Sequence, residues 1–444
     1  MAGRYKAYPA YKDSGVEWLG EIPEGWQLLP CRSIVNNIVE KNDNAKDQNY
    51  LSLMANIGVI RYEDKGDVGN KKPDDLSKCK IVRKGNLVIN SMNYAIGSYG
   101  MSEYDGVCSP VYIVLEPILS LVERRFVLRV FENKPFQKYL SIFGNGILEH
   151  RSAIGWDNIK GAYIPLPSKE AQQTIAQFLD YETAKIDALI AKQEQLIELL
   201  KEKRQAVISH AVTKGLNPDA PMKDSGVEWL GQVPEHWKVV RLKHLLREPL
   251  LYGANESAES QNLEHPRFIR ITDIDSNGLL RDETFRSLDP EIAKGYMLSD
   301  GDVLLARSGA TVGKSFIYRG IWGDCCFAGY LIRASFDHKI IEPEFFYLIT
   351  QSKFYHEWIN SSLIQATIQN VSAEKYNNLH IALPSSKEIN KILLFLKIKD
   401  KQFIELVNKA TMAVNLLQER KTALISAAVT GKIDVRDWQP PSVG

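Results

Sequence analysis

Cysteine is scarce in this chain, and its spacing excludes two kinds of site. The 444 residues include five cysteines without a C-x-x-C pair, and two of the five, Cys325 and Cys326, are adjacent. Disulfide frameworks and zinc sites need spaced pairs, so we expect neither, and we expect a reducing compartment. The chain opens without a signal-peptide pattern, and no uncharged run is long enough to span a bilayer. These absences predict a soluble cytoplasmic protein.

An excess of charge of either sign is also missing. The net charge is +1, with 25% charged and 44% hydrophobic residues, as in an ordinary globular protein. Without a global positive field, any nucleic-acid partner would have to meet local basic patches.

The common catalytic motifs are absent. No G-x-G-x-x-G opens a helix, and there is no H-E-x-x-H or G-x-S-x-G. Ser308–Ser315 ends like a P-loop, but Ser308 replaces the first glycine, and Gly309 comes one residue too late. The residues that follow predict a strand and turn instead of the helix that would hold phosphate. We predict a non-catalytic chain, with nucleotide binding through Lys314 and Ser315 as the enzyme alternative.

Several sequence motifs occur twice in the chain. Asp13–Gly20 returns letter for letter as Asp224–Gly231, and each copy is followed by a Pro-x-x-Trp that ends at Trp26 or Trp237. Later matches share a longer offset: Leu166–Ser168 with Leu383–Ser385, Phe178–Leu179 with Phe395–Leu396, and Ala206–Thr213 with Ala423–Thr430. A period above 200 residues is too long for a solenoid and indicates a duplicated two-part module.

Each half ends in a long segment without proline or glycine, Lys169–Val212 and Lys387–Val429. Apolar residues recur there every four and three residues, which predicts a coiled-coil seam. The alternative is an amphipathic helix that lies on its own domain. The predicted seam consists of Ile175, Leu179, Ile186, Leu189, Leu196, Leu200, Val207, Ile392, Leu396, Phe403, Leu406, Leu417 and Leu424.

The connection between the halves sets the expected topology. Only about 20 residues link the first helix to Trp237, so the second helix has to run back antiparallel to the first, which brings the C-terminus near the N-terminus. The fold class is therefore α+β, with two similar globular domains joined by two long antiparallel coiled-coil helices in a pseudo-two-fold repeat. The expected parts are a first globular domain (1–165), a first helix (166–215), a second domain (216–382), a second helix (383–432) and a tail (433–444).

Side chains suited to reading base edges gather where the two halves differ. Arginine and lysine suit guanine, and asparagine and glutamine suit adenine, in the major groove of DNA. Each one taken alone is more simply a solvated surface residue, so the pattern carries the inference. The candidates are Lys71, Lys72, Arg83, Asn90, Asn93, His150, Arg151, Arg267, Arg270, Arg307, Ser308, Thr311, Lys314, Gln365, Thr367 and Gln369.

In the order of its doubled motifs, the chain resembles the specificity (S) subunits of type I restriction-modification systems over nearly its whole length. The resemblance implies two target-recognition domains that read the halves of a bipartite DNA site, with the helices as spacers. It also implies double-stranded DNA, two modification (methyltransferase) subunits and restriction (translocase/nuclease) subunits as partners. S-adenosylmethionine, ATP and Mg²⁺ would belong to those partners, and no cofactor or metal to this chain. Gln365–Gln369 has no clear counterpart in Gly146–His150, which departs from a strict repeat.

Geometry extends this hypothesis. Two readers on one face of B-DNA lie about one turn, 10–10.5 bp, apart, which leaves a gap of about 5–7 bp between half-sites. Removing one heptad from either helix is expected to shorten the gap or abolish binding. Exposed Glu198, Lys201 and Glu202 would dock partner helices or form a solvated face. A duplicated scaffold that binds protein or glycan is the other functional class, and it would lack the steep salt dependence of DNA binding.

Overall fold

The computed structural model describes residues 5–69, 71–142, 154–257, 259–275, 278–364 and 370–440. The candidates His150, Arg151, Gln365, Thr367 and Gln369 lie outside these ranges. The chain forms two compact units: unit 1 consists of Met1–Glu194 and Met412–Gly444, and unit 2 of Gln195–Thr411. Each unit thus combines residues from both halves of the sequence. The domain boundaries expected above stay a prediction.

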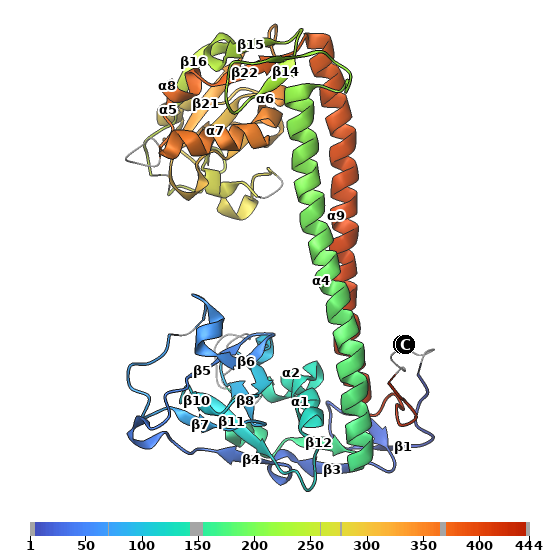
Figure 1. The fold of residues 1–444 in the computed structure, drawn as a ribbon. Helices are drawn as coiled ribbons and strands as arrows, with labels where there is room; N and C mark the ends of the chain where they lie inside the picture. Colours follow the sequence, from blue (N-terminus) through green and yellow to red (C-terminus); the bar gives the residue numbers. More distant parts are fainter. Residues whose placement is uncertain are drawn as a thin grey trace. The chain divides into compact units, whose positions relative to one another are not determined.

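Unit 1 is built on a four-stranded antiparallel sheet in the order β4-β11-β8-β9 (Figure 1). Its strands are β4 (Val35–Ile38), β11 (Tyr112–Pro117), β8 (Leu87–Asn90) and β9 (Tyr99–Met101). Leu87 and Ile89 of β8 point into the core under the helices, and Val88 points to the opposite face, where it packs with Leu53. Both faces are covered, which explains why this strand is an unbroken apolar run.

Shorter elements complete unit 1. The strand pairs are β1 (Tyr11–Asp13) with β2 (Glu21–Pro23), β3 (Gln27–Pro30) with β12 (Tyr163–Leu166), β5 (Leu51–Met54) with β6 (Gly58–Arg61), and β7 (Lys80–Val82) with β10 (Gly106–Cys108). The short helices are α1 (Arg124–Glu132), α2 (Lys134–Ile142) and α3 (Trp156–Ile159).

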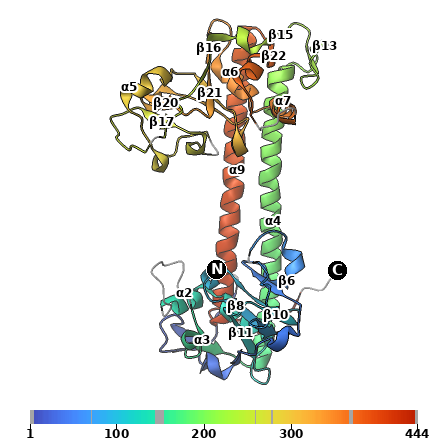
Figure 2. The ribbon, with the colours of Figure 1, turned by 90° about the vertical axis from the view of Figure 1, so that its left-hand side faces the viewer.

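Unit 2 repeats the sheet order as β16-β21-β18-β19. The strands are β16 (Leu246–Tyr252), β21 (Leu331–Phe336), β18 (Val303–Ala306) and β19 (Ser315–Ile317). The remaining pairs are β13 (Met222–Asp224) with β14 (Gln232–Pro234), β15 (Lys238–Arg241) with β22 (His380–Leu383), and the parallel pair β17 (Arg267–Ile269) with β20 (Cys325–Phe327). The short helices are α5 (Pro290–Ala293), α6 (Pro343–Ile349), α7 (Lys353–Ile364) and α8 (Ala373–Asn377). Figure 2 shows α5, β17 and β20 gathered on one side of β21.

The repeated eight-residue segment closes a hairpin in each unit. The amides of Gly15 and Gly226 donate to Asp13 and Asp224 Oδ1 at 3.0 and 2.9 Å, and both turns then close with the same backbone hydrogen bonds. Its identity in the two halves therefore has a local structural cause, because the aspartate and glycine build the turn.

The two long helices are α4 (Lys169–Lys214) and α9 (Ser386–Val429). Ser168 and Ser385 cap their first turns, and Gly215 and Gly431 follow them with positive φ. In unit 1 the start of α4 packs with the end of α9, and Lys421 pairs with Asp187 at 2.8 Å. In unit 2 the end of α4 packs with the start of α9, and Arg204 pairs with Asp400. Within each unit the helices therefore run antiparallel.

The predicted seam is wrong at three positions. Leu189, Leu196 and Leu406 are exposed, and their neighbours Ile190, Ile197 and Val407 are half-buried instead. In α4 the covered positions are Ile175, Leu179, Glu182, Ile186, Ile190, Gln193, Ile197, Leu200, Arg204, Ile208 and Ala211. They span 211 − 175 = 36 residues in ten steps, or 3.6 per step. That is the period of a straight α-helix, whereas the predicted heptad has a period of 3.5.

The two ends of the chain meet in unit 1, as the topology predicted. The amide of Asp434 donates to the Lys6 carbonyl at 2.7 Å, and the Tyr11 hydroxyl donates to the Gly431 carbonyl at 3.0 Å. Ile433 and Val435 are buried in the core of this unit. Residues 433–435 thus form part of the globular structure.

All five cysteines are free and buried. Burial raises the pKa of the Cys31, Cys108, Cys325 and Cys326 thiols to about 12, so these thiols stay protonated at neutral pH. Over the described ranges, no helix combines the length and the hydropathy needed to cross a bilayer.

Candidate nucleic-acid interface

One loop has the same length and the same closing hydrogen bond in both units. It joins β8 to β9 in unit 1 (Ser91–Ser98) and β18 to β19 in unit 2 (Arg307–Lys314). The amides of Asn90 and Ala306 donate to the Ser98 and Lys314 carbonyls at 2.9 and 2.8 Å. The offsets are 306 − 90 = 216 and 314 − 98 = 216, and a 3₁₀ turn lies inside each loop. The buried central strands β8 and β18 lead into the loops, and the edge strands β9 and β19 follow them, an arrangement suited to displaying binding residues on a rigid support.

A glycine with positive φ closes each loop. Gly97 has φ 93° and Gly313 has φ 82°. A Cβ at Gly97 would lie 2.3 Å from Asn56 Oδ1, and one at Gly313 would lie 3.1 Å from Ile359 side-chain carbons. The left-handed backbone angle favours glycine at both positions, and at Gly97 the close contact with Asn56 adds to this preference.

The β18–β19 loop is basic. The Arg307 guanidinium lies over the Tyr252 ring, 4.9 Å from its centroid, and its Nε donates to the Gly329 carbonyl at 3.1 Å. Among the described residues its two Nη groups have no hydrogen-bond partner. Lys314 is exposed, and the loop contains no acidic residue. The ring holds one face of the guanidinium and leaves its two Nη groups free to donate. Such a group is suited to binding a phosphate or a guanine edge.

The β8–β9 loop carries no charge. Asn93 is exposed there, beside exposed Met92 and Ile96. An amide suits an adenine edge, and apolar side chains suit a thymine methyl group. The two loops thus occupy matching places in the two sheets and differ in the chemistry that they display.

Several sequence candidates have internal partners instead. Arg267 is buried and donates to the Arg281 carbonyl at 2.6 Å. Arg270 forms a two-pronged pair with buried Asp273, at 2.7 and 3.0 Å. Asn90 is buried at the end of β8, and its Oδ1 accepts from the Met92 amide. These three side chains have partners within the protein, and their contact with DNA stays a prediction.

Three further candidates lie in unit 1 outside the loop. Arg83 pairs with Glu40 at 2.8 Å, and both side chains are half-exposed. The Lys72 ammonium donates to the Gln48 carbonyl at 3.2 Å, and Lys71 is exposed. In unit 2, Ser308 and Thr311 share the loop with Arg307 and Lys314 and are half-buried. Unit 2 therefore brings four predicted residues together, whereas unit 1 brings only Asn93 to the matching loop.

Two aromatic residues beside the loop of unit 2 were missed in the sequence. Tyr330 is 67% exposed, and its carbonyl accepts from the Arg307 amide at 3.1 Å. The Tyr252 hydroxyl accepts from the Ala373 amide at 2.9 Å, which fixes the ring under Arg307. Tyrosines in a strand-like run predict core packing, so only the three-dimensional position reveals their exposure.

The P-loop-like segment has the geometry of a hairpin. Lys314 leads directly into the strand β19, as the residues after it predicted. The helix N-terminus that would bind phosphate in a P-loop is therefore replaced by a strand at this point.

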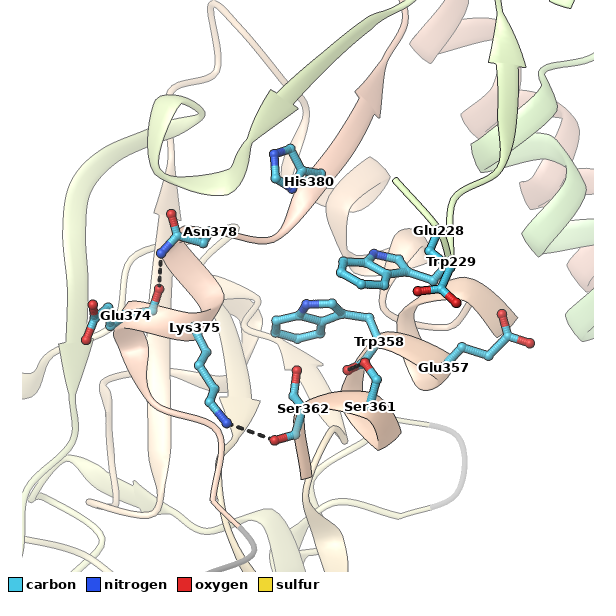
Figure 3. Close-up of a pocket in the computed structure, with 10 residues that line it drawn as sticks. All are labelled: Glu228, Trp229, Glu357, Trp358, Ser361, Ser362, Glu374, Lys375, Asn378 and His380. Carbon is cyan, nitrogen blue, oxygen red and sulfur yellow. Dashed lines mark hydrogen bonds between the residues drawn. The ribbon is translucent and has the colours of Figure 1, made fainter. Parts of the chain in front are cut away.

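A separate cavity of about 680 Å³ lies in unit 2 beside the second copy of the repeated segment (Figure 3). Trp229 of that segment and Trp358 of α7 line one side, and Lys375 and Asn378 line the other. The Lys375 ammonium turns down to the Ser362 carbonyl at 2.8 Å. In unit 1 the matching Trp18 packs on Phe136 with ring centroids 5.0 Å apart. The cavity shares no residue with the β18–β19 loop.

Comparison with known proteins assigns the family. The family model of type I restriction modification DNA specificity domains matches residues 23–199 and 234–416, once in each half. The chain belongs to this family, whose function is DNA specificity and not catalysis.

Curated relatives agree with this family. The MjaVIII specificity subunit of Methanocaldococcus jannaschii, a type I restriction enzyme subunit, is 24% identical over 94% of this chain and 95% of its own length. The EcoBI specificity subunit of Escherichia coli is 28% identical over 53% of this chain and 51% of its own length. The putative MjaX specificity subunit of M. jannaschii is 24% identical over 55% and 58%. The chain thus spans about half the length of the last two relatives in these matches.

Solved structures share the fold. One, described as the structural basis of complex assembly and conformational transition of the type I R-M system, has a TM-score of 0.71 at 16% identity. It covers 93% of this chain and 99% of the other. The HsdS subunit from Thermoanaerobacter tengcongensis has a TM-score of 0.51 at 15% identity and covers 95% and 100%.

Proposed function

We propose that this chain is the sequence-specific DNA-binding subunit of a type I restriction-modification complex. Each unit would read one half of a bipartite site through its hairpin loop, and α4 and α9 would act as a coiled-coil spacer that sets the gap. The main support is the pair of loops at matching places in two sheets of the same strand order, which display different side chains. A shared sheet framework gives both readers a similar approach to DNA, and different side chains give them different half-sites.

The same proposal covers the partners. Two modification subunits would dock on exposed faces of the helices, and restriction subunits would complete the complex. Unit 1 exposes Leu189 on α4 and Leu416 on α9, and unit 2 exposes Leu199 and Leu406. With an offset of 217, Leu189 corresponds to Leu406 and Leu199 to Leu416, so both helices display apolar residues at repeated positions. Such repetition suits two copies of one partner. S-adenosylmethionine, ATP and Mg²⁺ would be bound by those partners.

The decisive experiment maps adenine methylation in a host that expresses this chain with its modification subunit. A bipartite methylated motif that disappears on deletion of the gene supports the proposal. A variant in which Arg307–Lys314 replaces Ser91–Ser98 should change one half of the motif and leave the other half intact. If no motif depends on the gene although the subunits co-purify, a protein- or glycan-binding scaffold becomes the better explanation.

A further inference from the structure

Unit 2 contains an apolar groove between α6, the end of α4 and the start of α9. Its volume is about 350 Å³. Five apolar side chains from α4 and α9 line it, together with Tyr347 and Leu348 of α6. The five are Val207, Ile208, Leu393, Leu396 and Phe403.

At the matching place in unit 1 a buried arginine stands where unit 2 has a leucine. Buried Phe126 of α1 corresponds to Phe345 of α6 (345 − 126 = 219), and the same offset matches Arg129 to Leu348. The Arg129 guanidinium binds Glu132 at 2.5 Å, Asp180 at 2.7 Å and the Thr183 hydroxyl at 3.1 Å. It thereby ties α1 to α4, whereas Leu348 at the matching place in unit 2 makes no such bonds.

The charges around the open groove are reversed. On the long helices the offset is 217, so Lys397 stands where unit 1 has Asp180, and Lys399 stands where unit 1 has Glu182. The two carboxylates of the groove, Glu344 and Asp400, are already paired with Arg319 and Arg204. Lys397 has no ion pair among the described residues. An occupant that completes this groove therefore has to be apolar with negative charge at its edge, the opposite of the arginine in unit 1.

We propose that this groove, the α6 groove, receives a segment of a partner protein that presents a large apolar side chain flanked by carboxylates. Exposed Leu394 and Ile398 extend the apolar surface along α9 next to the groove. DNA fits poorly, because a phosphate among apolar walls would lose its hydration without a full set of donors. The corresponding cavity of unit 1, about 340 Å³, is lined by Arg125, Arg129 and Glu132 instead, so the partner is expected to bind the groove of unit 2. The proposal does not depend on the DNA function.

The test uses the full chain and a variant that closes the groove. Leu348→Arg with Lys397→Asp installs in unit 2 the arginine–aspartate pair of unit 1. The probe is a fluorescent helical peptide with a leucine–phenylalanine stripe flanked by glutamates, and the matched peptide carries lysines in place of the glutamates. We expect saturable binding of the glutamate peptide at one per chain. Binding should weaken about tenfold or more with the lysine peptide and with the closed variant.

A second variant guards against misfolding. Lys397→Glu keeps the groove open and reverses the charge at its edge. It should therefore weaken binding of the glutamate peptide and strengthen binding of the lysine peptide. The proposal is overturned if the glutamate peptide does not bind, or if the closed variant binds it as well as the original chain does. It is also overturned if duplex DNA displaces the peptide and loses affinity in the closed variant, because the groove would then belong to the DNA surface.

Discussion

Gly313 illustrates how a single backbone angle supports the β18–β19 loop. Its φ of 82° disfavours a Cβ, and the Ile359 side chain would have to shift to admit one. We expect Gly313→Ala to lower the free energy of unfolding by about 1–2 kcal/mol, the cost of a left-handed conformation for a residue with a side chain. Urea denaturation measures this. Gly295→Ala is the control, because a Cβ there meets no atom within 4 Å and φ is not in the left-handed region.

Arg307 is the side chain expected to contribute most to the second half-site. Arg307→Ala should weaken binding of the cognate duplex by about 1–3 kcal/mol, the value of one two-pronged base contact. Arg307→Lys keeps the charge but loses the fork and the stacking on Tyr252, so it should restore only part of the affinity. Titration with labelled duplex at fixed salt measures both. Exposed Lys339→Ala is the control, and an equal loss there would reduce Arg307 to a general electrostatic role.

The sequence alone does not distinguish side chains that could contact DNA from side chains that stabilise the fold. Arg267 and Arg307 look alike in the sequence, yet one donates to the distant Arg281 carbonyl and the other leaves its fork free. The difference comes from tertiary partners, so residue type alone could not predict it. The closing turn of the β18–β19 hairpin was predictable, because its glycine and the strand after it are local signals.

At the scale of elements, the attachment of α1 to α4 depends on one buried arginine. Arg129→Leu removes the cation and leaves Asp180 and Glu132 beside an apolar side chain, as leucine stands at the matching place in unit 2. We expect a loss of about 3–5 kcal/mol of stability in unit 1. Denaturation followed by hydrogen exchange in α1 measures it. Arg125→Leu breaks the half-exposed pair with the same Asp180 and should cost about 1 kcal/mol or less.

The long helices show how far a periodic pattern can be read. Their extent, their caps and their antiparallel contacts within each unit were predictable from the absence of proline and glycine and from the short connection. Which residues of each helix are buried was not predictable, because apolar residues stand side by side in the sequence. These neighbours are Leu189 and Ile190, Leu196 and Ile197, and Leu406 and Val407. Either member of each pair satisfies an apolar pattern, and only the position of the partner helix selects the isoleucines and the valine.

At the scale of the whole molecule, the spacer hypothesis has a sharp test. Eleven residues make close to three full turns, so removing Leu189–Leu199 and Leu406–Leu416 together keeps the buried faces in phase. The helices shorten by about 16 Å, and the preferred gap should shrink by about five base pairs at 3.4 Å each. Selection of bound duplexes from a library of gap lengths measures this. An unchanged gap in a folded, DNA-binding variant contradicts the spacer role.

The composition of the units also bears on how such a chain can arise. Unit 1 takes the end of α9 from the second half, and unit 2 takes the end of α4 from the first. A chain of residues 1–215 alone would leave the buried face of its helix uncovered. Two copies could cover each other by exchanging helices, because α4 and α9 share their register. The resulting homodimer would carry two identical loops, and its target would be a palindrome. The present chain then corresponds to such a dimer joined into one gene, in which each loop is free to change without the other.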